Sequence, residues 1–446
     1  PRKPLTRPRD ERGGVYIRRP LMRALLSHLA IAVLLLSSCT EDAAEPHDRT
    51  PRMGSWRMEL DVRSGTDERA VVLPFLFDLQ GDSSKRTLLV HNGDETIVVD
   101  DVTITADTFH VRMPLFDSEF SGKPSADSVI TGYWYNHLKG PDYRIPFTAR
   151  AGITQRFAES PDTHHDLTGN WECHFAEGTP DAYPALGIFN CTNGRVTGTF
   201  GTETGDYRFL DGVVHGDSLL LSAFDGSHAF LFHAALRGDS LIGRFRSGIH
   251  SQEPWYAVRN EAFHLRNPDS LTFLKEGYEM VDVRLPDLNG DTVSLMDERF
   301  HGHVRMLQVM GSWCPNCVDE TILLTEMYDE YHDQGLDVVA IAFERYPERQ
   351  QAVGSLKHFK ERLGVKYDVL YGGESRKEVA AAKLPFLNHV MSYPTCVFID
   401  RAGKVRRIRT GFYGPGTGAH YANYKRNLKA FIEQMLAEPV EGKKAA

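Results

Sequence analysis

The sequence predicts a multidomain protein in which an all-β antiparallel region precedes an α/β domain with a mixed central sheet flanked by helices. At 446 residues the chain is too long for a single core. From Met53 to about Phe263, short alternating apolar stretches are separated by glycine, aspartate and asparagine, which is typical of a β sandwich or barrel. After Asn267-Pro268, strand patterns alternate with helical ones, which indicates a mixed sheet covered on both faces.

The first 39 residues are expected to be a leader that ends in a lipoprotein signal peptide. An apolar run over residues 24–36 follows Met22, the expected initiator, and is too short for a membrane span. The run ends in Leu36-Ser37-Ser38-Cys39, which resembles the lipobox of bacterial lipoprotein signal peptides. The resemblance implies cleavage before Cys39 and acylation of its thiol. An ordinary secretory signal with an incidental cysteine is the alternative.

Either signal exports the mature protein. With a lipidated Cys39, the protein would be anchored to a bacterial membrane in the cell envelope and face the periplasm or the exterior, which is often oxidising. Residues 40–52 follow the signal; they are acidic overall, contain proline and lack hydrophobic periodicity. They are therefore expected to form a flexible tether.

The β region is expected to consist of two tandem, repeat-like antiparallel units over residues 53–165 and 166–266. Each unit would have an ordinary domain size. Three blocks recur in the same order, offset by 108 to 115 residues. They match Gly54-Ser55-Trp56 with Gly169-Asn170-Trp171, Asp107-Thr108-Phe109 and Phe116-Asp117-Ser118 with Asp217-Ser218-Leu219 and Phe224-Asp225-Gly226, and Asp127-Ser128-Val129-Ile130 with Asp239-Ser240-Leu241-Ile242.

Residues 267–440 are expected to form the α/β domain, and residues 441–446 a disordered tail. The domain opens with a hairpin over 285–291 that turns at Asn289-Gly290. The elements expected next are a strand over 304–310, a helix over 315–333, a strand over 337–343, a helix over 348–363, a strand over 367–371, a helix over 375–383, strands over 395–399 and 405–409, and a helix over 421–436.

The motif Cys314-Pro315-Asn316-Cys317 lies between the strand expected over 304–310 and the helix that follows it. Two cysteines at this spacing can interconvert between dithiol and disulfide. At a helix start, unpaired N–H groups face the Cys314 sulfur, and the helix macrodipole favours the thiolate. Pro315 suits the first helical position because its missing N–H has no partner there. The motif is therefore predicted to be a redox centre.

The last 170 or so residues resemble the thioredoxin superfamily, specifically the membrane-tethered TlpA-like and ResA-like thiol–disulfide oxidoreductases, which are related to AhpC/TSA proteins. The resemblance covers well under half of the chain and does not extend to the β region. It rests on the following residues: Leu285-Pro286-Asp287, Gly290, Trp313-Cys314-Pro315-Asn316-Cys317, Glu320, Ser392-Tyr393-Pro394-Thr395 and Gly411-Phe412.

The resemblance implies a redox-active disulfide in which Cys314 is the nucleophile and Cys317 the resolving thiol. Pro394 would be the cis-proline facing the pair, which leaves the backbone of Tyr393 free to bind a substrate peptide, with Thr395 next to it. From the residues alone, Tyr393-Pro394-Thr395 is equally compatible with the start of a strand, where proline is permitted. Trp313 would cover the substrate-binding surface, although a packing role suits it as well.

Glu320 lies three residues after Cys317, one turn along the expected helix. By the resemblance, its carboxylate would relay a proton to or from the resolving thiol as a third catalytic residue. The alternative is an acidic residue placed in the first turn because the helix dipole favours it there. The residues between the cysteines carry no charge, which favours a reducing exchanger over a strong oxidant.

The remaining cysteines suggest structural roles. Cys173 and Cys191 lie on consecutive expected strands, and in an exported domain a structural disulfide between them is the natural expectation, with two free thiols as the alternative. Cys396 is expected to be a small buried residue. A zinc site formed by His301, His303 and the redox pair is disfavoured by the spacing, so neither a metal nor a cofactor is expected.

The expected function is that of an envelope-anchored thiol–disulfide oxidoreductase, acting as a disulfide reductase. Its expected partners are disulfide-containing proteins as substrates, a membrane electron-relay reductase as electron donor, and the membrane itself through the lipid anchor. Cytochrome c maturation is one family role. The formal net charge of −9 argues against a nucleic-acid partner. Two alternatives remain: a thiol peroxidase, and a β-region binding or docking module with an accessory redox domain.

Overall fold

A computed structural model describes residues 48–65, 67, 69–82, 85–158 and 165–439. The predicted leader, its Cys39, most of the predicted tether and the predicted tail over 441–446 lie outside these residues. Within the described ranges, no helix is both long and apolar enough to cross a membrane.

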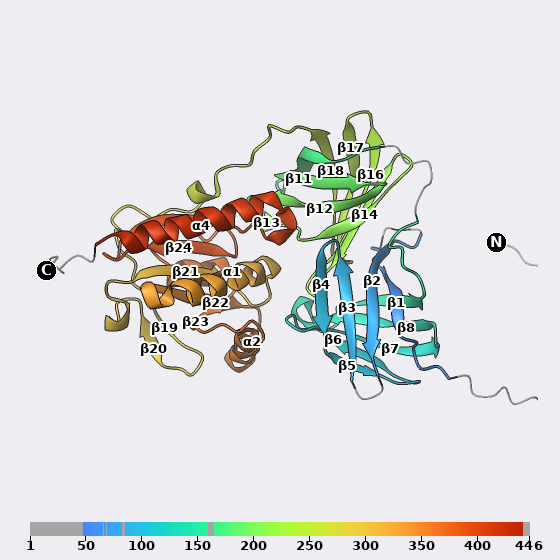
Figure 1. The fold of residues 1–446 in the computed structure, drawn as a ribbon, viewed down its shortest axis with the longest axis horizontal. Helices are drawn as coiled ribbons and strands as arrows, with labels where there is room; N and C mark the ends of the chain where they lie inside the picture. The colour runs from blue at the N-terminus through green and yellow to red at the C-terminus, as the bar shows by residue number, and fades with distance from the viewer. Residues whose placement is uncertain (1–47, 66, 68, 83–84, 159–164, 440–446) are drawn as a thin grey trace, which may run out of the picture. The chain divides into compact units, whose positions relative to one another are not determined.

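The first β unit is a nine-stranded antiparallel sheet with the order β4-β3-β2-β1-β9-β8-β7-β6-β5 (Figure 1). Strand β1 therefore pairs with both its sequence neighbour β2 and the last strand, β9. The strands are β1 (Gly54–Asp61), β2 (Val72–Gly81), β3 (Arg86–Asn92), β4 (Glu95–Val99), β5 (Asp101–Ile104), β6 (Phe109–Arg112), β7 (Ser118–Ala126), β8 (Val129–Asn136) and β9 (Arg144–Ala151).

The second β unit is also a nine-stranded antiparallel sheet, and its additional pairing of β11 with β12 makes it barrel-like. Its first strand, β10, pairs with both β11 and the last strand, β18. The strands are β10 (Gly169–Phe175), β11 (Tyr183–Thr192), β12 (Arg195–Thr202), β13 (Gly205–Asp206), β14 (Leu210–His215), β15 (Ser218–Phe224), β16 (Ala229–Arg237), β17 (Ser240–Ser247) and β18 (Ser251–Arg259).

Alternation of apolar and polar residues gives each sheet its buried face. Along β1, Trp56, Met58 and Leu60 are buried and the residues between them are partly exposed. The two tryptophans that open the units are held in the same way: Trp56 Nε1 donates to the Arg52 carbonyl and Trp171 Nε1 to the Leu167 carbonyl, each at 3.0 Å. The prediction of antiparallel β structure is confirmed.

The predicted disulfide between Cys173 and Cys191 is wrong, because both residues are free thiols. The strand register explains the error. Cys173 on β10 lies opposite Ala185 on β11, whereas Cys191 lies six residues further along β11 and pairs with Val196 of β12. At about 3.4 Å per residue, the two positions are separated by about 20 Å along the strand, well beyond the reach of a disulfide.

The C-terminal region has a five-stranded mixed sheet with the order β23-β22-β21-β24-β25 (Figure 1). Its strands are β21 (Val304–Met310), β22 (Leu336–Glu344), β23 (Asp368–Glu374), β24 (Thr395–Ile399) and β25 (Val405–Thr410). The helices are α1 (Pro315–Tyr331), α2 (Arg349–Arg362), α3 (Lys377–Lys383) and α4 (Ala419–Ala437). A hairpin of β19 (Arg284–Pro286) and β20 (Thr292–Ser294) precedes the sheet. This arrangement is the thioredoxin-like fold that the sequence predicts.

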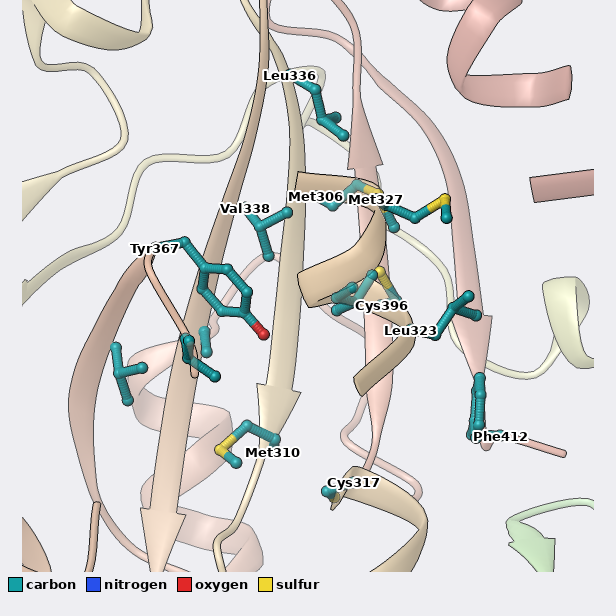
Figure 2. Packing of buried hydrophobic residues seen from close by; sticks show 14 of the residues in the cluster. Met306, Met310, Cys317, Leu323, Met327, Leu336, Val338, Tyr367, Cys396 and Phe412 are labelled. Atoms are coloured by element: carbon teal, nitrogen blue, oxygen red, sulfur yellow. The ribbon is translucent and has the colours of Figure 1, made fainter. Parts of the chain in front are cut away.

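Both faces of this sheet are buried. One face packs against α1, α2 and α4, and the other packs against α3 and the β19–β20 hairpin. Figure 2 shows part of the first cluster, in which Met306, Val338 and Cys396 of the sheet lie near Leu323 and Met327 of α1. Cys396 is 1% exposed, as predicted for a small buried residue. The redox motif lies at the edge of this packed core, where α1 begins.

Candidate active site

Cys314 is the N-cap residue of α1. Its sulfur accepts a hydrogen bond from the Cys317 N–H at 3.3 Å and lies 3.4 Å from the Tyr393 carbonyl oxygen, to which the thiol donates. The Cys317 N–H, which the Cys314 carbonyl shares at 3.0 Å, and the positive end of the helix dipole both favour a negative charge on this sulfur. Cys314 retains 6% of its surface exposed, while Cys317 is fully buried. Both are free thiols, so the structure represents the dithiol form.

Burial raises the pKa of the Cys317 thiol well above its ordinary value, and the neighbouring Cys314 and the charge of Glu320 raise it further. Glu320 is 1% exposed. Its pKa is raised to about 7 by burial, against the opposing effects of a hydrogen bond from Gln308 and the charge of Arg409. The Cys317 thiol and the Glu320 carboxyl, which titrates near neutrality, are therefore both buried, one helical turn apart.

Gln308 on β21 was not singled out from the sequence, yet it orients Glu320. Its amide Nε2 donates to Glu320 Oε2 at 2.9 Å, and its Oε1 accepts from Thr321 Oγ1 at 3.2 Å. Gln308 is fully buried. The signal in the sequence was an amide in the otherwise apolar middle of a strand, where a polar group needs a partner.

Replacing Glu320 with glutamine is expected to flatten the dependence of stability on pH. The folded pKa of about 7 exceeds the ordinary value of 4.5, so the folded protein keeps a proton that the unfolded chain releases. Stability from this group is present at low pH and is lost as pH rises to about 7. Chemical denaturation of the reduced protein between pH 4.5 and about 7 measures the effect. In this range, E320Q should remove a decrease in the free energy of unfolding of up to about 1.4 kcal/mol per pH unit.

Glu326 provides the matched control, because it lies on the same helix with its side chain 46% exposed. E326Q should leave the slope of the wild-type protein in place. Equal slopes for E320Q and the wild type would contradict the assignment of a near-neutral titration to Glu320.

Of the other predicted site residues, Trp313 precedes Cys314 in the chain and Tyr393 lies against the Cys314 sulfur through its carbonyl. The Tyr393–Pro394 peptide bond is cis. The rings of Trp313 and Tyr393 meet edge to face with centroids 5.7 Å apart, and Trp313 Nε1 donates to the Phe343 carbonyl at 2.9 Å. Thr395 is fully buried and its hydroxyl donates to the Ser392 carbonyl at 2.9 Å, so its side chain has no surface to offer a substrate.

A second buried carboxylate, also missed from the sequence, anchors the loop before the motif. Glu344 at the end of β22 accepts from the Ser312 N–H and from Ser312 Oγ, both at 2.8 Å. Burial raises its pKa to about 7. His301 and His303, considered above for zinc, bond instead to the Met296 carbonyl and to Asp337.

The start of α1 is also held by the β region. Arg208 of the second β unit donates to Asp319 at 2.6 Å and to the Pro315 carbonyl at 3.2 Å. The same guanidinium pairs with Glu95 of the first β unit and lies 3.7 Å from Asp225. All four charged side chains are nearly buried, with at most 13% of each exposed. We call these four residues the Arg208 cluster.

The fold and the cysteine pair define the C-terminal region as a thioredoxin-like oxidoreductase domain: an N-capping thiol, a buried second thiol and an adjacent cis-proline can exchange two electrons with a disulfide. Residues 277–408 match the model of the AhpC/TSA family. The region is thus similar in sequence to ResA-like proteins of the thioredoxin superfamily.

Curated relatives carry related names. The chain is 29% identical over 140 residues to the thiol-disulfide oxidoreductase ResA of Geobacillus thermodenitrificans, covering 31% of this chain and 72% of the relative. It is 28% identical over 131 residues to ResA of Bacillus thuringiensis subsp. konkukian, covering 29% of this chain and spanning 66% of that relative's length.

Solved structures of similar proteins include a thiol:disulfide interchange protein of the thioredoxin family from Chlorobium tepidum TLS. It is 17% identical, covers 36% of this chain and 99% of its own, and has a TM-score of 0.29. A DsbF homologue from Corynebacterium diphtheriae is 20% identical, covers 38% of this chain and 98% of its own, and has a TM-score of 0.28.

Proposed function

We propose that the protein is an exported, lipid-anchored disulfide reductase that acts on proteins, with Cys314 as the nucleophile and Cys317 as the resolving thiol. One observation carries this proposal: Cys314 caps α1 with its sulfur beside the Tyr393 carbonyl, while the buried Cys317 lies next to Glu320. An accessible thiolate and a shielded second thiol are what stepwise disulfide exchange requires.

In the first step, the Cys314 thiolate attacks one sulfur of the substrate disulfide. A new bond forms between Cys314 and the substrate, the substrate disulfide breaks, and the departing sulfur takes up a proton. Trp313 and the Tyr393 backbone hold the substrate segment beside Cys314. The helix dipole at the start of α1 stabilises the attacking thiolate.

In the second step, the Glu320 carboxylate accepts the proton of Cys317, and the resulting thiolate attacks Cys314 Sγ. The mixed disulfide breaks, the substrate leaves with both sulfurs reduced, and Cys314 and Cys317 are joined in a disulfide. A carboxyl with a pKa of about 7 suits this task, since near neutrality it can both accept and return a proton. A membrane electron-relay reductase then restores the dithiol.

The proposed location rests on the apolar run over residues 24–36 and the lipobox-like Leu36-Ser37-Ser38-Cys39, which support a lipid anchor in the cell envelope. The folded part would then work in the periplasm or outside the cell. Relatives named thiol-disulfide oxidoreductase support protein disulfides as substrates, and apocytochrome c is one candidate.

We further propose that the two β units are tandem copies of one ancestral unit. Adding nine to each strand number of the first unit gives the strand pairings of the second unit. The exception is the pairing of β12 with β14, which closes the second sheet. The matched sequence blocks begin at corresponding strands: β1 and β10, β6 and β15, and β8 and β17. The shared hydrogen bonds of Trp56 and Trp171 support the same correspondence.

The reduced full-length protein is expected to reduce the disulfides of a small protein such as insulin at least tenfold faster than it consumes hydrogen peroxide. Peroxidases of the related family place a threonine three residues before the reactive cysteine, and this chain has Gly311 there. A Cβ at that position would lie 2.4 Å from Trp313 Nε1, so the loop accepts no side chain. Faster turnover of peroxide than of protein disulfide would instead favour the thiol peroxidase.

A further inference from the structure

The second β unit closes one side of the cysteine pair. A Cβ on Gly205 of β13 would lie 2.8 Å from Asn316 Nδ2, so backbone and active-site side chain are in direct contact. The neighbouring Asp206 accepts from the Gly414 N–H at 2.5 Å. Together with Arg208, this turn covers the start of α1 and the loop that follows β25. A substrate therefore cannot approach Cys314 past Asn316, which leaves the side of Trp313.

Arg345 lies on that remaining side. Its guanidinium carbon is 3.7 Å from the centroid of the Trp313 ring, a cation–π contact. Burial lowers the pKa of Arg345, and the negative charges of Cys314 and Glu344 oppose that effect, so the guanidinium lies within electrostatic reach of the reactive sulfur. Among the residues that the structure describes, no carboxylate forms a salt bridge with Arg345.

Hydrogen bonds join the carbonyl of Trp313 to the segment of the first β unit that carries Lys139. Ser227 Oγ donates to the Trp313 carbonyl at 3.3 Å, and Asn136 Nδ2 donates to the Ser227 carbonyl at 3.1 Å. The short helix His137–Lys139 follows Asn136 directly. Lys139 Nζ then lies over the ring of Tyr143, 5.2 Å from its centroid.

The charges of these residues affect one another. Burial lowers the pKa of Lys139 to about 8, with the charge of Arg345 adding to the effect and Asp225 opposing it. Burial lowers the pKa of His250 to about 4, and Lys139, His228 and Arg345 lower it further. The nearby Asp225 is already engaged by His228 at 3.3 Å and belongs to the Arg208 cluster. Arg345 therefore lies over Trp313, and Lys139 lies over Tyr143 within electrostatic reach of Arg345. Neither cation has a salt-bridge partner in the described part of the chain.

We propose that Lys139 and Arg345 form the specificity determinant of the redox site, selecting protein segments in which carboxylates flank the disulfide. The inference rests on the proposed reductase function and names its substrate class. The β region thus completes the substrate site, since it supplies both the closed wall and one of the two cations. A carboxylate bound between Lys139 and Arg345 gains charge-assisted hydrogen bonds and relieves the repulsion between them.

Two synthetic peptides of equal length, each with one disulfide, test the proposal. One carries glutamates and the other lysines on both sides of each cysteine. With the reduced full-length protein at low ionic strength, kcat/KM for the acidic peptide is expected to exceed that for the basic one by about tenfold or more. The ratio should fall as salt is added, because exposed charges are screened.

K139Q and R345Q should each reduce this ratio several-fold. The matched control is K123Q, because Lys123 is an exposed lysine on β7 of the same β unit; its ratio should equal that of the wild type. A wild-type ratio near one, or a ratio unchanged in both K139Q and R345Q, overturns the inference and leaves the reductase function standing. Failure of the wild-type protein to reduce either peptide overturns the reductase function itself.

Discussion

Replacing Arg208 with alanine is expected to lower the free energy of unfolding by about 3–5 kcal/mol, because the change leaves several buried carboxylates without their counter-charge. The side chains of Glu95, Asp225 and Asp319 are at most 13% exposed. Burial already raises the pKa of Asp319 to about 7, and the charge of Arg208 is the main effect that opposes it. Without Arg208, carboxylates from two β units and from α1 face one another in a site that excludes water.

Urea denaturation of the full-length protein measures this loss, with Arg266→Ala as the control. Arg266 forms an ion pair with Glu203, which lies close to Arg208 in the sequence, but its side chain is 67% exposed. Exposed ion pairs contribute little, so this variant should behave almost like the wild type. Similar small losses for both variants would mean that the Arg208 cluster does not hold the β region against the redox domain.

The redox domain was predictable because its signals are local. The strands predicted over 304–310 and 395–399 are β21 and β24 with the same bounds, and α1 begins at Pro315 as predicted. An apolar run, a capping cysteine and a proline at the first helical position all lie within twelve residues of sequence. When the hydrophobic pattern and the helix-capping residues agree over so short a segment, few other secondary structures are compatible with its sequence.

The parts of the site that depend on distant residues were not predictable. Glu95, Arg208, Asp225 and Asp319 come from three segments more than 90 residues apart, and each on its own looks like an ordinary surface charge. Cys173 and Cys191 do not pair because of the strand register. The prediction that two strands are consecutive does not specify that register. Long-range pairing of this kind arises from tertiary packing, so no single-sequence pattern carries it.

The contacts between the β region and the redox site change the expected role of the β region. The only role that the sequence suggested for it was that of a binding or docking module with an accessory redox domain. The structure places Ser227 and Gly205 against Trp313 and Asn316 on either side of Cys314. Because the second β unit contacts the residues before and after Cys314 in the sequence, it limits the directions from which a substrate can approach the sulfur.

Replacing Cys317 with serine is expected to increase the amount of mixed disulfide on Cys314 by a hundredfold or more, on the order of the rate advantage of an intramolecular thiol. Without the resolving thiol, the complex formed in the first step can be released only by an external thiol. Among the described cysteines, only Cys317 is placed to resolve this complex. The others lie elsewhere: Cys173 and Cys191 in the second β unit, and Cys396 inside the sheet.

The control is Cys191→Ser, the same substitution at a half-buried thiol of the second β unit, which should trap nothing. The C314S/C317S double variant should also trap nothing, because the nucleophile is gone.

The decisive measurement is non-reducing mass analysis of the full-length C317S protein after incubation with a protein disulfide. The expected result is a covalent adduct that maps to Cys314 and dissociates with dithiothreitol. An adduct that maps to another cysteine, or none at all while the wild type turns the same substrate over, would contradict the assignment of Cys314 as nucleophile and Cys317 as its resolving thiol.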